Sequence, residues 1–242
     1  MDGVTRSPLD FIADPGTALL VDLDGTVTDS YDGITRSFNH ALDAIGEPRA
    51  DDDFLRTIVG PPLADSLHAR GLGDDRVAAA IAAYRERYDV VGWRENRVYD
   101  QMTELLRDLA ASGRTMAIAT SKNQRIARTI VDHFGLTPYF RFVAGAGENG
   151  TRPTKADVVG HALEVLQLDP TATPVVMIGD RSHDVVGAAE HGIPTVSVTW
   201  GYALPGELAA AASSVGLTGG AGIAPDRWIV DSVQRLREEL GV

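Results

Sequence analysis

Ala18-Leu19-Leu20-Val21-Asp22-Leu23-Asp24-Gly25-Thr26 is the stretch that decides the fold of this chain. The apolar residues before Asp22 are typical of a strand that is buried on both faces, as in the middle of a parallel sheet. Two carboxylates then stand at the carboxyl end of the strand, where open α/β sheets bind ligands. Because side chains alternate along a strand, Asp22 and Asp24 point to the same side, and Gly25 allows a sharp turn directly after them.

Two ionised carboxylates this close repel each other unless a cation lies between them or one of them holds a proton. A divalent metal ion would keep Asp22 ionised as a nucleophile, while Asp24 transfers a proton to and from a leaving oxygen. The alternative interpretation is a strand end followed by an ordinary turn, since Asp and Gly are common turn residues. The rest of the chain has to decide between these interpretations.

The composition indicates a globular protein and argues against several partners. The 242 residues, 44% of them hydrophobic and 23% charged, suit one large domain or a domain with a smaller insert. The net charge of -12 argues against nucleic acid, although a small anion can still bind at a locally positive site. There is no cysteine, no apolar run near the roughly 20 residues of a membrane helix, and no signal-peptide pattern between Met1 and Asp14. We therefore expect a cytoplasmic monomer or homodimer that binds a small molecule, with no nucleic-acid or membrane partner.

A helical block follows the first strand. From about Tyr31 to about Trp93, apolar residues recur at helical spacing and no strand is evident. Such a block over the ligand-binding edge of a sheet predicts an inserted all-α domain at 31–93, with a core formed by 1–30 and 94–242. Gly60-Pro61-Pro62 ends one of the helices and is either a rigid turn or a loop that contacts the substrate.

From Tyr99 onward, apolar strands alternate with amphipathic helices. The predicted strands are 115–119, 141–144, 175–178, 195–198 and 228–230. This alternation with short links predicts a doubly wound parallel sheet with right-handed crossovers, so the fold class is α/β with an inserted all-α domain. The small, glycine-rich stretch 213–224 is interpreted as a mobile surface loop.

Polar residues follow three of the predicted strands. They are Asp22 with Asp24, Thr120 with Ser121, and Asp180 with Asp184. The carboxyl ends of parallel strands share one edge of the sheet, so residues far apart in the sequence meet in one crevice. Each group alone could be a turn or helix-capping residue, but three groups at three strand ends favour one site. Hydroxyl and N–H groups of Thr120-Ser121, at a helix N-terminus, would bind an anion there.

The oxygen ligands at this edge indicate magnesium. Asp22, Asp180 and a backbone carbonyl suit Mg²⁺, which prefers octahedral oxygen coordination and keeps several waters. A bound phosphate would need a cation as well. Lys155, at the start of a predicted helix, is the leading candidate, with Lys122 and Arg152 as alternatives.

Four motifs, in order and spacing, resemble those of the haloacid dehalogenase (HAD) superfamily over nearly the whole chain. They are Asp22-Leu-Asp-Gly-Thr-Val, Thr120-Ser121, Lys155 and Gly179-Asp-Arg-Ser-His-Asp184. The resemblance implies a Rossmann-like core with a helical cap domain, and a Mg²⁺-dependent phosphatase that forms an aspartyl-phosphate.

The same resemblance implies a role for each matched residue. Asp22 would be the nucleophile and Asp24 the general acid and then base. Phosphate contacts would come from Thr120 or Ser121 and from Lys155. The metal would be bound by Asp22, the carbonyl of Asp24 and Asp180, and by Asp184 directly or through water.

Further segments resemble the phosphoglycolate phosphatase-like branch of the superfamily. They are Asp29-Ser-Tyr-Asp-Gly-Ile34, Val59-Gly-Pro-Pro-Leu63, Thr120-Ser-Lys122 and Gly179-Asp-Arg-Ser-His-Asp-Val185. The branch includes members that act on nucleoside monophosphates and other small phosphoesters. We therefore expect a phosphomonoesterase for a small phosphorylated metabolite, most like phosphoglycolate phosphatase. The alternatives are a 5′-nucleotidase-type phosphatase, a β-phosphoglucomutase-like phosphomutase and a catalytically silent binding protein.

Overall fold

A six-stranded sheet forms the centre of the computed structural model, which describes residues 11–216 and 228–242. The strand order is β5-β4-β1-β6-β7-β8, and every neighbouring pair is parallel. The strands are β1 (Ala18–Val21), β4 (Met116–Asn123), β5 (Phe142–Ala146), β6 (Val175–Gly179), β7 (Thr195–Val198) and β8 (Ile229–Val230). The predicted parallel α/β sheet is confirmed, and the strand expected at 228–230 lies at one edge.

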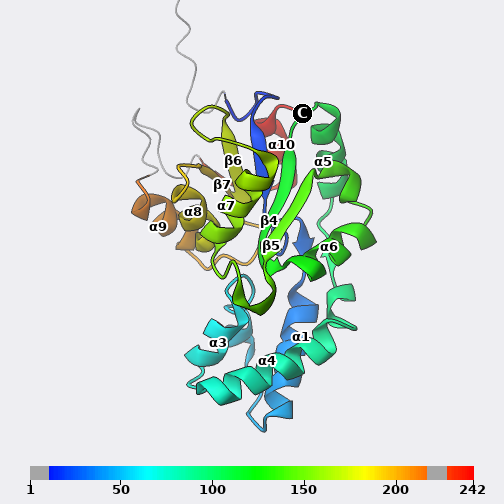
Figure 1. Ribbon diagram of the computed structural model, residues 1–242, viewed down its shortest axis with the longest axis vertical. Coiled ribbons are helices and arrows are strands. Elements are labelled where there is room, and N and C mark those ends of the chain that lie inside the picture. The colour runs from blue at the N-terminus through cyan, green and yellow to red at the C-terminus, as the bar shows by residue number, and fades with distance from the viewer. Residues whose placement is uncertain (1–10, 217–227) are drawn as a thin grey trace, which may run out of the picture.

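Helices cover both faces of this sheet (Figure 1). Side chains of β1 alternate between the faces: Leu19 and Val21 join one apolar cluster, and Ala18 and Leu20 join the other. The helices that cover the sheet on the side of the first cluster are α5 (Met102–Ala111), α6 (Gln124–His133) and α10 (Val233–Leu240). Those of the second are α7 (Lys155–Leu166) and α8 (Ser182–Ala189), with α9 (Glu207–Ser214) packed against α8. Burial on both faces explains why β1 is a continuous apolar run.

Four helices, here called the cap helices, lie together below the sheet in Figure 1. They are α1 (Tyr31–Ala44), α2 (Asp52–Leu55), α3 (Leu63–Ala69) and α4 (Asp74–Tyr88). α1 packs along α4, and Phe38, Leu42 and Ala80 are fully buried. No helix among the described residues has the length and apolar character needed to cross a membrane. The boundaries 31–93 of a separate domain stay a prediction.

A two-stranded ribbon lies where the chain passes between the sheet and the cap helices. β2 (Thr28–Asp29) pairs antiparallel with β3 (Arg97–Val98). The sequence analysis does not predict this ribbon, because strands of two residues are too short to show a period. Within residues 11–216, single turns of 3₁₀-helix also occur at η1 (Gly92–Arg94), η2 (Thr137–Tyr139) and η3 (Glu148–Gly150).

Two predicted boundaries differ from the structure. β4 does not end at Thr120-Ser121 but continues to Asn123, with a shift in its register against β5. The next helix begins only at Gln124, and the Asn123 side chain accepts hydrogen bonds from its first free N–H groups. Thr120-Ser121 therefore do not lie at a helix N-terminus.

The predicted surface loop also starts later than expected. Ser213 and Ser214 belong to α9, and both hydroxyls donate to carbonyls of that helix. The alanines before them favour a helix, and this preference extends through the two serines. Residues 217–224 of the predicted loop lie outside the described residues.

Candidate active site

The carboxyl ends of β1, β4 and β6 lie next to one another. Val21, the last residue of β1, pairs with Ile118 of β4 on one side and with Ile178 of β6 on the other. Asp22 and Asp180 directly follow β1 and β6, and both are buried. The order of the strands thus brings together residues that are far apart in the sequence.

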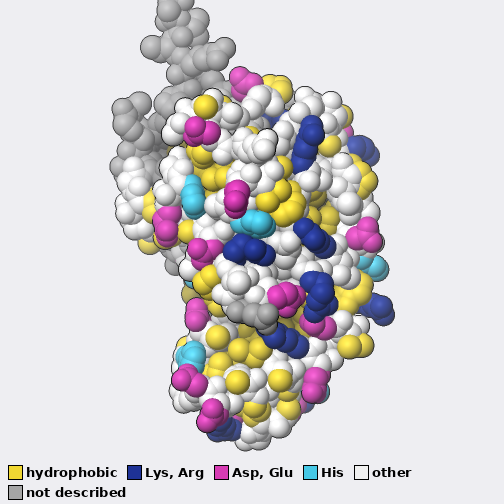
Figure 2. Space-filling model, in the orientation of Figure 1, with side chains coloured by type: hydrophobic (Ala, Val, Ile, Leu, Met, Phe, Trp, Pro, Cys, Tyr) yellow, Lys and Arg dark blue, Asp and Glu magenta, His cyan; other side chains and the backbone are white. Residues whose placement is uncertain are grey.

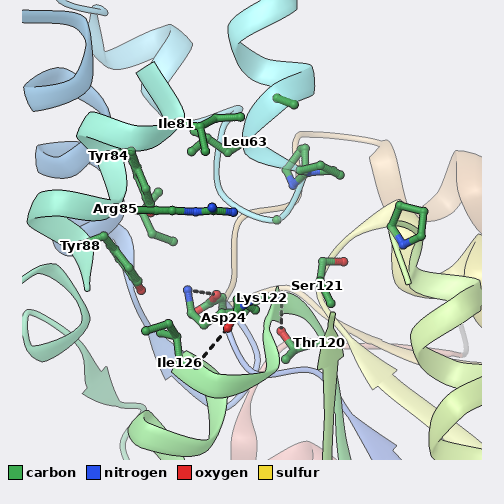
Figure 3. A pocket seen from close by; sticks show the side chains of 18 of the residues that line it. Asp24, Leu63, Ile81, Tyr84, Arg85, Tyr88, Thr120, Ser121, Lys122 and Ile126 are labelled. Atoms are coloured by element: carbon green, nitrogen blue, oxygen red, sulfur yellow. Dashed lines mark hydrogen bonds and ion pairs between the residues drawn. The ribbon is translucent and has the colours of Figure 1, made fainter. Parts of the chain in front are cut away.

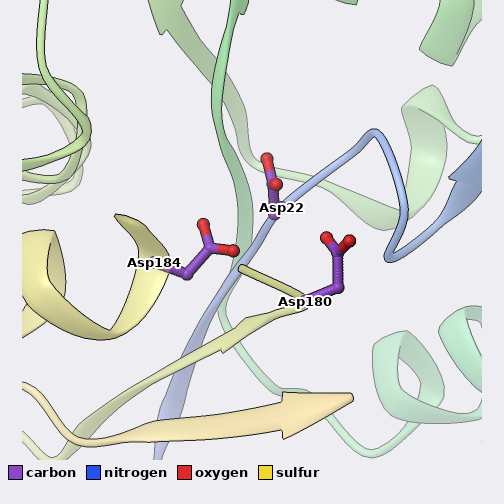
Figure 4. Close-up of side chains that lie close together, drawn as sticks. All are labelled: Asp22, Asp180 and Asp184. Carbon is purple, nitrogen blue, oxygen red and sulfur yellow. The ribbon is translucent and has the colours of Figure 1, made fainter. Parts of the chain in front are cut away.

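Asp22, Asp180 and Asp184 form a buried carboxylate cluster (Figure 4). One oxygen from each carboxylate lies within 4.8 Å of the others. Asp184 is in the first turn of α8, where its Oδ2 accepts a hydrogen bond of 3.0 Å from the N–H of Arg181. Burial raises the pKa of Asp22, although Lys155 acts against this. Burial and the two neighbouring carboxylates raise the pKa of Asp180 well above its usual range.

This donor set fits a divalent cation. Three buried carboxylates lie close together, and one buried ammonium group contacts only two of them, so negative charge is in excess where water screens it little. Hard cations such as Mg²⁺ bind carboxylate oxygens by preference. The side chain of Asp24 is not part of the cluster. Its main-chain carbonyl, which the sequence analysis expects as a ligand, stays a prediction.

Lys155 is the cation inside the cluster. Its Nζ lies 2.9 Å from Asp22 Oδ1 and 2.6 Å from Asp184 Oδ1, and it donates a hydrogen bond of 3.0 Å to the carbonyl of Ala119. Burial acts to lower the pKa of Lys155, but the two carboxylates outweigh this effect and raise it. Lys155 is therefore a permanent positive charge beside Asp22.

A different cation holds Asp24. Lys122 Nζ lies 2.7 Å from Asp24 Oδ2 and 4.6 Å from the ring centroid of Tyr88. The other oxygen of Asp24, Oδ1, is buried and has no hydrogen-bond partner among the described residues. From the sequence alone, Lys122 is only an alternative phosphate-binding cation. Its position beside Asp24 follows from the continuation of β4 past Thr120.

Asp180 is positioned by the loop after β1 and by the loop after β7. Its Oδ1 accepts a hydrogen bond of 3.1 Å from Thr26 Oγ1, and its Oδ2 accepts one of 2.8 Å from the N–H of Tyr202. Gly25 packs directly against it with a φ of +86°, and a Cβ there would lie 2.2 Å from Asp180 Oδ2. Tyr202 lies in no sequence motif, so the sequence analysis does not find it.

Arg181 connects this edge of the sheet to the cap helices. Its Nη1 donates to the carbonyl of Val59, in the loop between α2 and α3, and its Nε donates to Glu207 Oε1 at 2.9 Å. Gly60 packs against the same side chain, since a Cβ there would lie 3.0 Å from Arg181 Cγ. The Gly60-Pro61-Pro62 segment therefore touches the loop that follows Asp180.

A cavity of about 370 Å³ lies between the strand ends and the cap helices (Figure 3). Asp22, Asp24, Thr120 and Ser121 line it on the sheet side. Lys155, Asp180 and Asp184 are not part of its lining, so Asp22 alone belongs to both the carboxylate cluster and the cavity. The cap side of the lining includes Leu63, Ile81, Tyr84, Arg85 and Tyr88.

Charge is unevenly distributed over the face shown in Figure 2. Lys and Arg side chains gather over the junction between the sheet and the cap helices, and hydrophobic side chains gather below them. The net charge of -12 therefore does not keep a small anion away from this junction.

The sequence of this chain is similar to those of a known protein family. The family model described as "Haloacid dehalogenase-like hydrolase" matches residues 19–198, which include every predicted site residue. Tyrosine-protein kinase PtkA of Mycobacterium tuberculosis is 50% identical over 184 residues, which make up 76% of this chain and 62% of that protein. This chain thus matches less than two thirds of the length of that relative.

Two further similarities cover most of both partners. A 5′-nucleotidase of Pseudomonas aeruginosa is 39% identical over 193 residues, 79% of this chain and 86% of that protein. The crystal structure of a predicted phosphatase from Clostridium acetobutylicum is similar with a TM-score of 0.81 and 35% identity, and covers 93% of this chain and 97% of that one. The similarity therefore includes the cap helices as well as the sheet.

Proposed function

The chain belongs to the haloacid dehalogenase-like hydrolases, and from this membership we propose that it is a Mg²⁺-dependent phosphatase for a small phosphate monoester. One observation carries the proposal: two carboxylates at one strand end are paired with two different cations. Asp22 contacts Lys155 beside the carboxylate cluster, and Asp24 contacts Lys122 beside the cavity. Such a division suits one nucleophile and one acid or base.

Asp22 is the nucleophile in this proposal. It lines the cavity, so a phosphate that enters from the cap side can reach its carboxylate. Lys155 favours the ionised form of this carboxylate against the effect of burial, because its ammonium group lies 2.9 Å away. A bond forms from Asp22 to phosphorus as the bond from phosphorus to the ester oxygen breaks, which leaves an aspartyl-phosphate. Asp22, Asp180 and Asp184 would hold Mg²⁺, which would supply charge neutralisation at the transferring phosphoryl group.

Asp24 is the general acid and then the general base in this proposal. It protonates the ester oxygen as the alcohol leaves, then takes a proton from the water that hydrolyses the aspartyl-phosphate. Lys122 contacts Oδ2, whereas the buried Oδ1 has no hydrogen-bond partner among the described residues, so no hydrogen bond has to break at Oδ1 before these transfers. Thr120 and Ser121 line the same end of the cavity and would hold phosphate oxygens there, with Lys155 as the permanent charge behind them.

A second candidate function is protein-tyrosine phosphorylation. The observation that favours it is the 50% identity over 184 residues to a protein named as a tyrosine kinase. The two functions differ in the donor and acceptor of the phosphoryl group. A phosphatase transfers it from a substrate ester to water, whereas a kinase transfers it from a nucleoside triphosphate to a tyrosine hydroxyl.

Phosphate release from small esters, with Mg²⁺ and with a chelator, tests the proposal. We expect release that the chelator abolishes, and a loss of at least about a thousandfold in Asp22→Asn. The variant should melt no lower than wild type in chelator, because one of three repelling carboxylates becomes neutral. Asp74→Asn, in which the replaced side chain is 99% exposed, is the matched control and should keep full activity.

Three results would contradict this assignment. Full activity of Asp22→Asn would exclude Asp22 as the nucleophile, and activity unchanged by the chelator would exclude the metal. Transfer of labelled phosphate from ATP to a tyrosine peptide, without phosphate release from any ester, would favour the kinase.

A further inference from the structure

The cap side of the cavity is not used by the chemistry described above. Leu63, Ile81, Tyr84 and Tyr88 line it, so its wall is apolar and aromatic (Figure 3). The rings of Tyr84 and Tyr88 are stacked, with centroids 5.1 Å apart and planes at 15°. A volume of about 370 Å³ lies within the range of pockets that enclose small organic ligands. A two-carbon acid would leave most of this apolar wall in contact with water.

Arg85 is a cation without a partner in this cavity. Its side chain extends from α4 across the cavity in Figure 3. Its guanidinium group makes no hydrogen bond or ion pair with any residue that the structure describes. The two other cations in the lining are both engaged: Lys122 contacts Asp24, and Arg152 donates to the carbonyl of Gly145 at 3.0 Å. Arg85 is thus free to bind an anionic group on a ligand.

The hydroxyl of Tyr88 is a second unused group. Tyr88 is only 3% exposed, and its hydroxyl oxygen is buried without a hydrogen-bond partner among the described residues. Figure 3 shows this hydroxyl directed toward the side of the cavity where Asp24 and Lys122 lie. Buried hydroxyl groups usually have a partner, so this hydroxyl is an unsatisfied polar group in the protein beside the cavity.

We propose that the cap side of the cavity is a leaving-group site for an aromatic ring that carries a negatively charged group. The ring packs against Tyr84 and the neighbouring apolar side chains, and the anionic group binds Arg85. The proposal rests on the proposed function, because the ring enters as the alcohol part of an ester whose phosphorus reaches Asp22. It narrows the substrate to aryl phosphates, or esters with a ring close to the phosphate, and argues against phosphoglycolate.

Four substrates separate the contribution of the ring from that of the charge. Ethyl phosphate has neither feature, phosphoglycolate has only the charge, phenyl phosphate has only the ring, and 4-carboxyphenyl phosphate has both. Aryl alcohols are better leaving groups in any enzyme, so each substrate is compared between wild type and variant by its kcat/KM. This ratio cancels the intrinsic reactivity of the ester.

We expect Arg85→Met to lower kcat/KM about tenfold for 4-carboxyphenyl phosphate and less than twofold for phenyl phosphate. Tyr84→Leu should lower kcat/KM about tenfold for both aryl substrates and change it less than twofold for ethyl phosphate. Arg56→Met is the matched control. Arg56 is another exposed cap arginine whose guanidinium makes no hydrogen bond or ion pair with a described residue, but it does not line the cavity. For all four substrates, the kcat/KM of this variant should stay within twofold of the wild-type value.

An equal effect of Arg85→Met on all four substrates, or no effect on any, would overturn the proposal. A failure of the phosphatase function is distinguishable, since wild type would then release phosphate from none of the four. If no phosphate is released, isothermal titration calorimetry can still measure binding. In this experiment 4-carboxyphenyl phosphate is titrated into Asp22→Asn and into the double variant that also carries Arg85→Met. About tenfold weaker binding in the double variant supports the leaving-group site, and equal binding contradicts it.

A further substrate distinguishes whether the ring belongs to an aryl phosphate or to the base of a nucleotide. A nucleoside 5′-monophosphate carries its ring through a sugar and has no second anionic group. If Arg85 and Tyr84 act as proposed, Tyr84→Leu should lower kcat/KM for the nucleoside 5′-monophosphate, and Arg85→Met should not. A response to Arg85→Met as large as that of 4-carboxyphenyl phosphate would mean that Arg85 binds the reacting phosphate, and would overturn its assignment to the leaving group.

Discussion

At the scale of single residues, the site distinguishes two aspartates by the cation that each contacts. Lys155 is shared between Asp22 and Asp184, whereas Lys122 is shared between Asp24 and the ring face of Tyr88. The side chains of both pairs are largely buried, so each ammonium group acts on its own carboxylate with little screening by water. Two chemically identical side chains, two residues apart, can therefore have different roles in the reaction.

Gly25 provides a residue-scale prediction. Its φ is +86°, and a Cβ would lie 2.2 Å from Asp180 Oδ2, so Gly25→Ala must displace the Asp180 carboxylate. We expect phosphate release to fall at least about tenfold, because metal ligands tolerate little displacement. Gly46→Ala is the control: its φ is +71°, but nothing lies within 4 Å of the added Cβ. It should cost about 1 kcal/mol of stability and leave activity unchanged. Similar activity in the two variants would show that Asp180 does not need this close packing.

At the scale of elements, a single carboxylate joins the starts of α8 and α9. Glu207 Oε1 accepts hydrogen bonds from Arg181 Nε at 2.9 Å and from the N–H of Ser182 at 2.8 Å, and its Oε2 accepts from the N–H of Leu204 at 2.9 Å. Burial acts to raise the pKa of Glu207, but these hydrogen bonds lower it to about 2. The end of α8 that carries Asp184 is thus held from outside the carboxylate cluster.

Glu207→Gln tests this junction through its pH dependence. A carboxylate whose folded-state pKa is lowered stabilises the protein above its ordinary pKa of 4.5, and this stabilisation is lost as the pH falls toward about 2. After allowance for screening by solvent, we expect the variant to lose about 1–2 kcal/mol of unfolding free energy at pH 7, and progressively less below pH 4.5.

Urea unfolding at pH 7, 4 and 3 measures this difference. Glu190→Gln is the control, since Glu190 is an exposed carboxylate at the other end of α8, and it should change stability by less than about 0.5 kcal/mol. A Glu207→Gln effect that stays constant from pH 7 to pH 3 would show that the ionised carboxylate is not what stabilises the junction.

At the scale of the whole molecule, two of the contacts between the sheet and the cap part of the chain lie beside the carboxylate cluster. One is Arg181, which donates to the carbonyl of Val59. The other is Tyr202, whose hydroxyl donates to Asp29 Oδ1 at 2.8 Å and accepts from the N–H of Ser30 at 2.7 Å. Because the N–H of Tyr202 also donates to Asp180, one residue contacts both the carboxylate cluster and the ribbon that leads to the cap helices.

Tyr202→Phe should therefore weaken the connection between the two parts. Loss of the hydroxyl leaves the N–H of Ser30 without this acceptor, which costs about 1–3 kcal/mol. For a chain of this size, we expect a melting temperature lower by about 2–4 °C per kcal/mol. Tyr139→Phe is the control, because Tyr139 is partly buried and its hydroxyl makes no hydrogen bond with a described residue. Equal melting temperatures for the two variants would contradict the bridging role of Tyr202.

The sequence by itself determined the sheet and the positions of the chemically important residues. Parallel strands are buried on both faces, so they are recognisable as short apolar runs, and the polar residues that end them have to lie at one edge. For this reason Asp22 and Asp180 could be assigned to one site although they are far apart in the chain. The roles of these residues in the reaction stay predictions until they are measured.

Only the tertiary structure decided which cation contacts which acid. Lys122 was assigned to Asp24, and Lys155 to Asp22 and Asp184, by the length of β4 and by the packing of α7 beside α8. Which residues line the cavity was likewise decided by the packing of the cap helices over the strand ends. Local periodicity shows which face of a helix is buried, but not which distant side chain it meets, because that depends on how complete elements pack together.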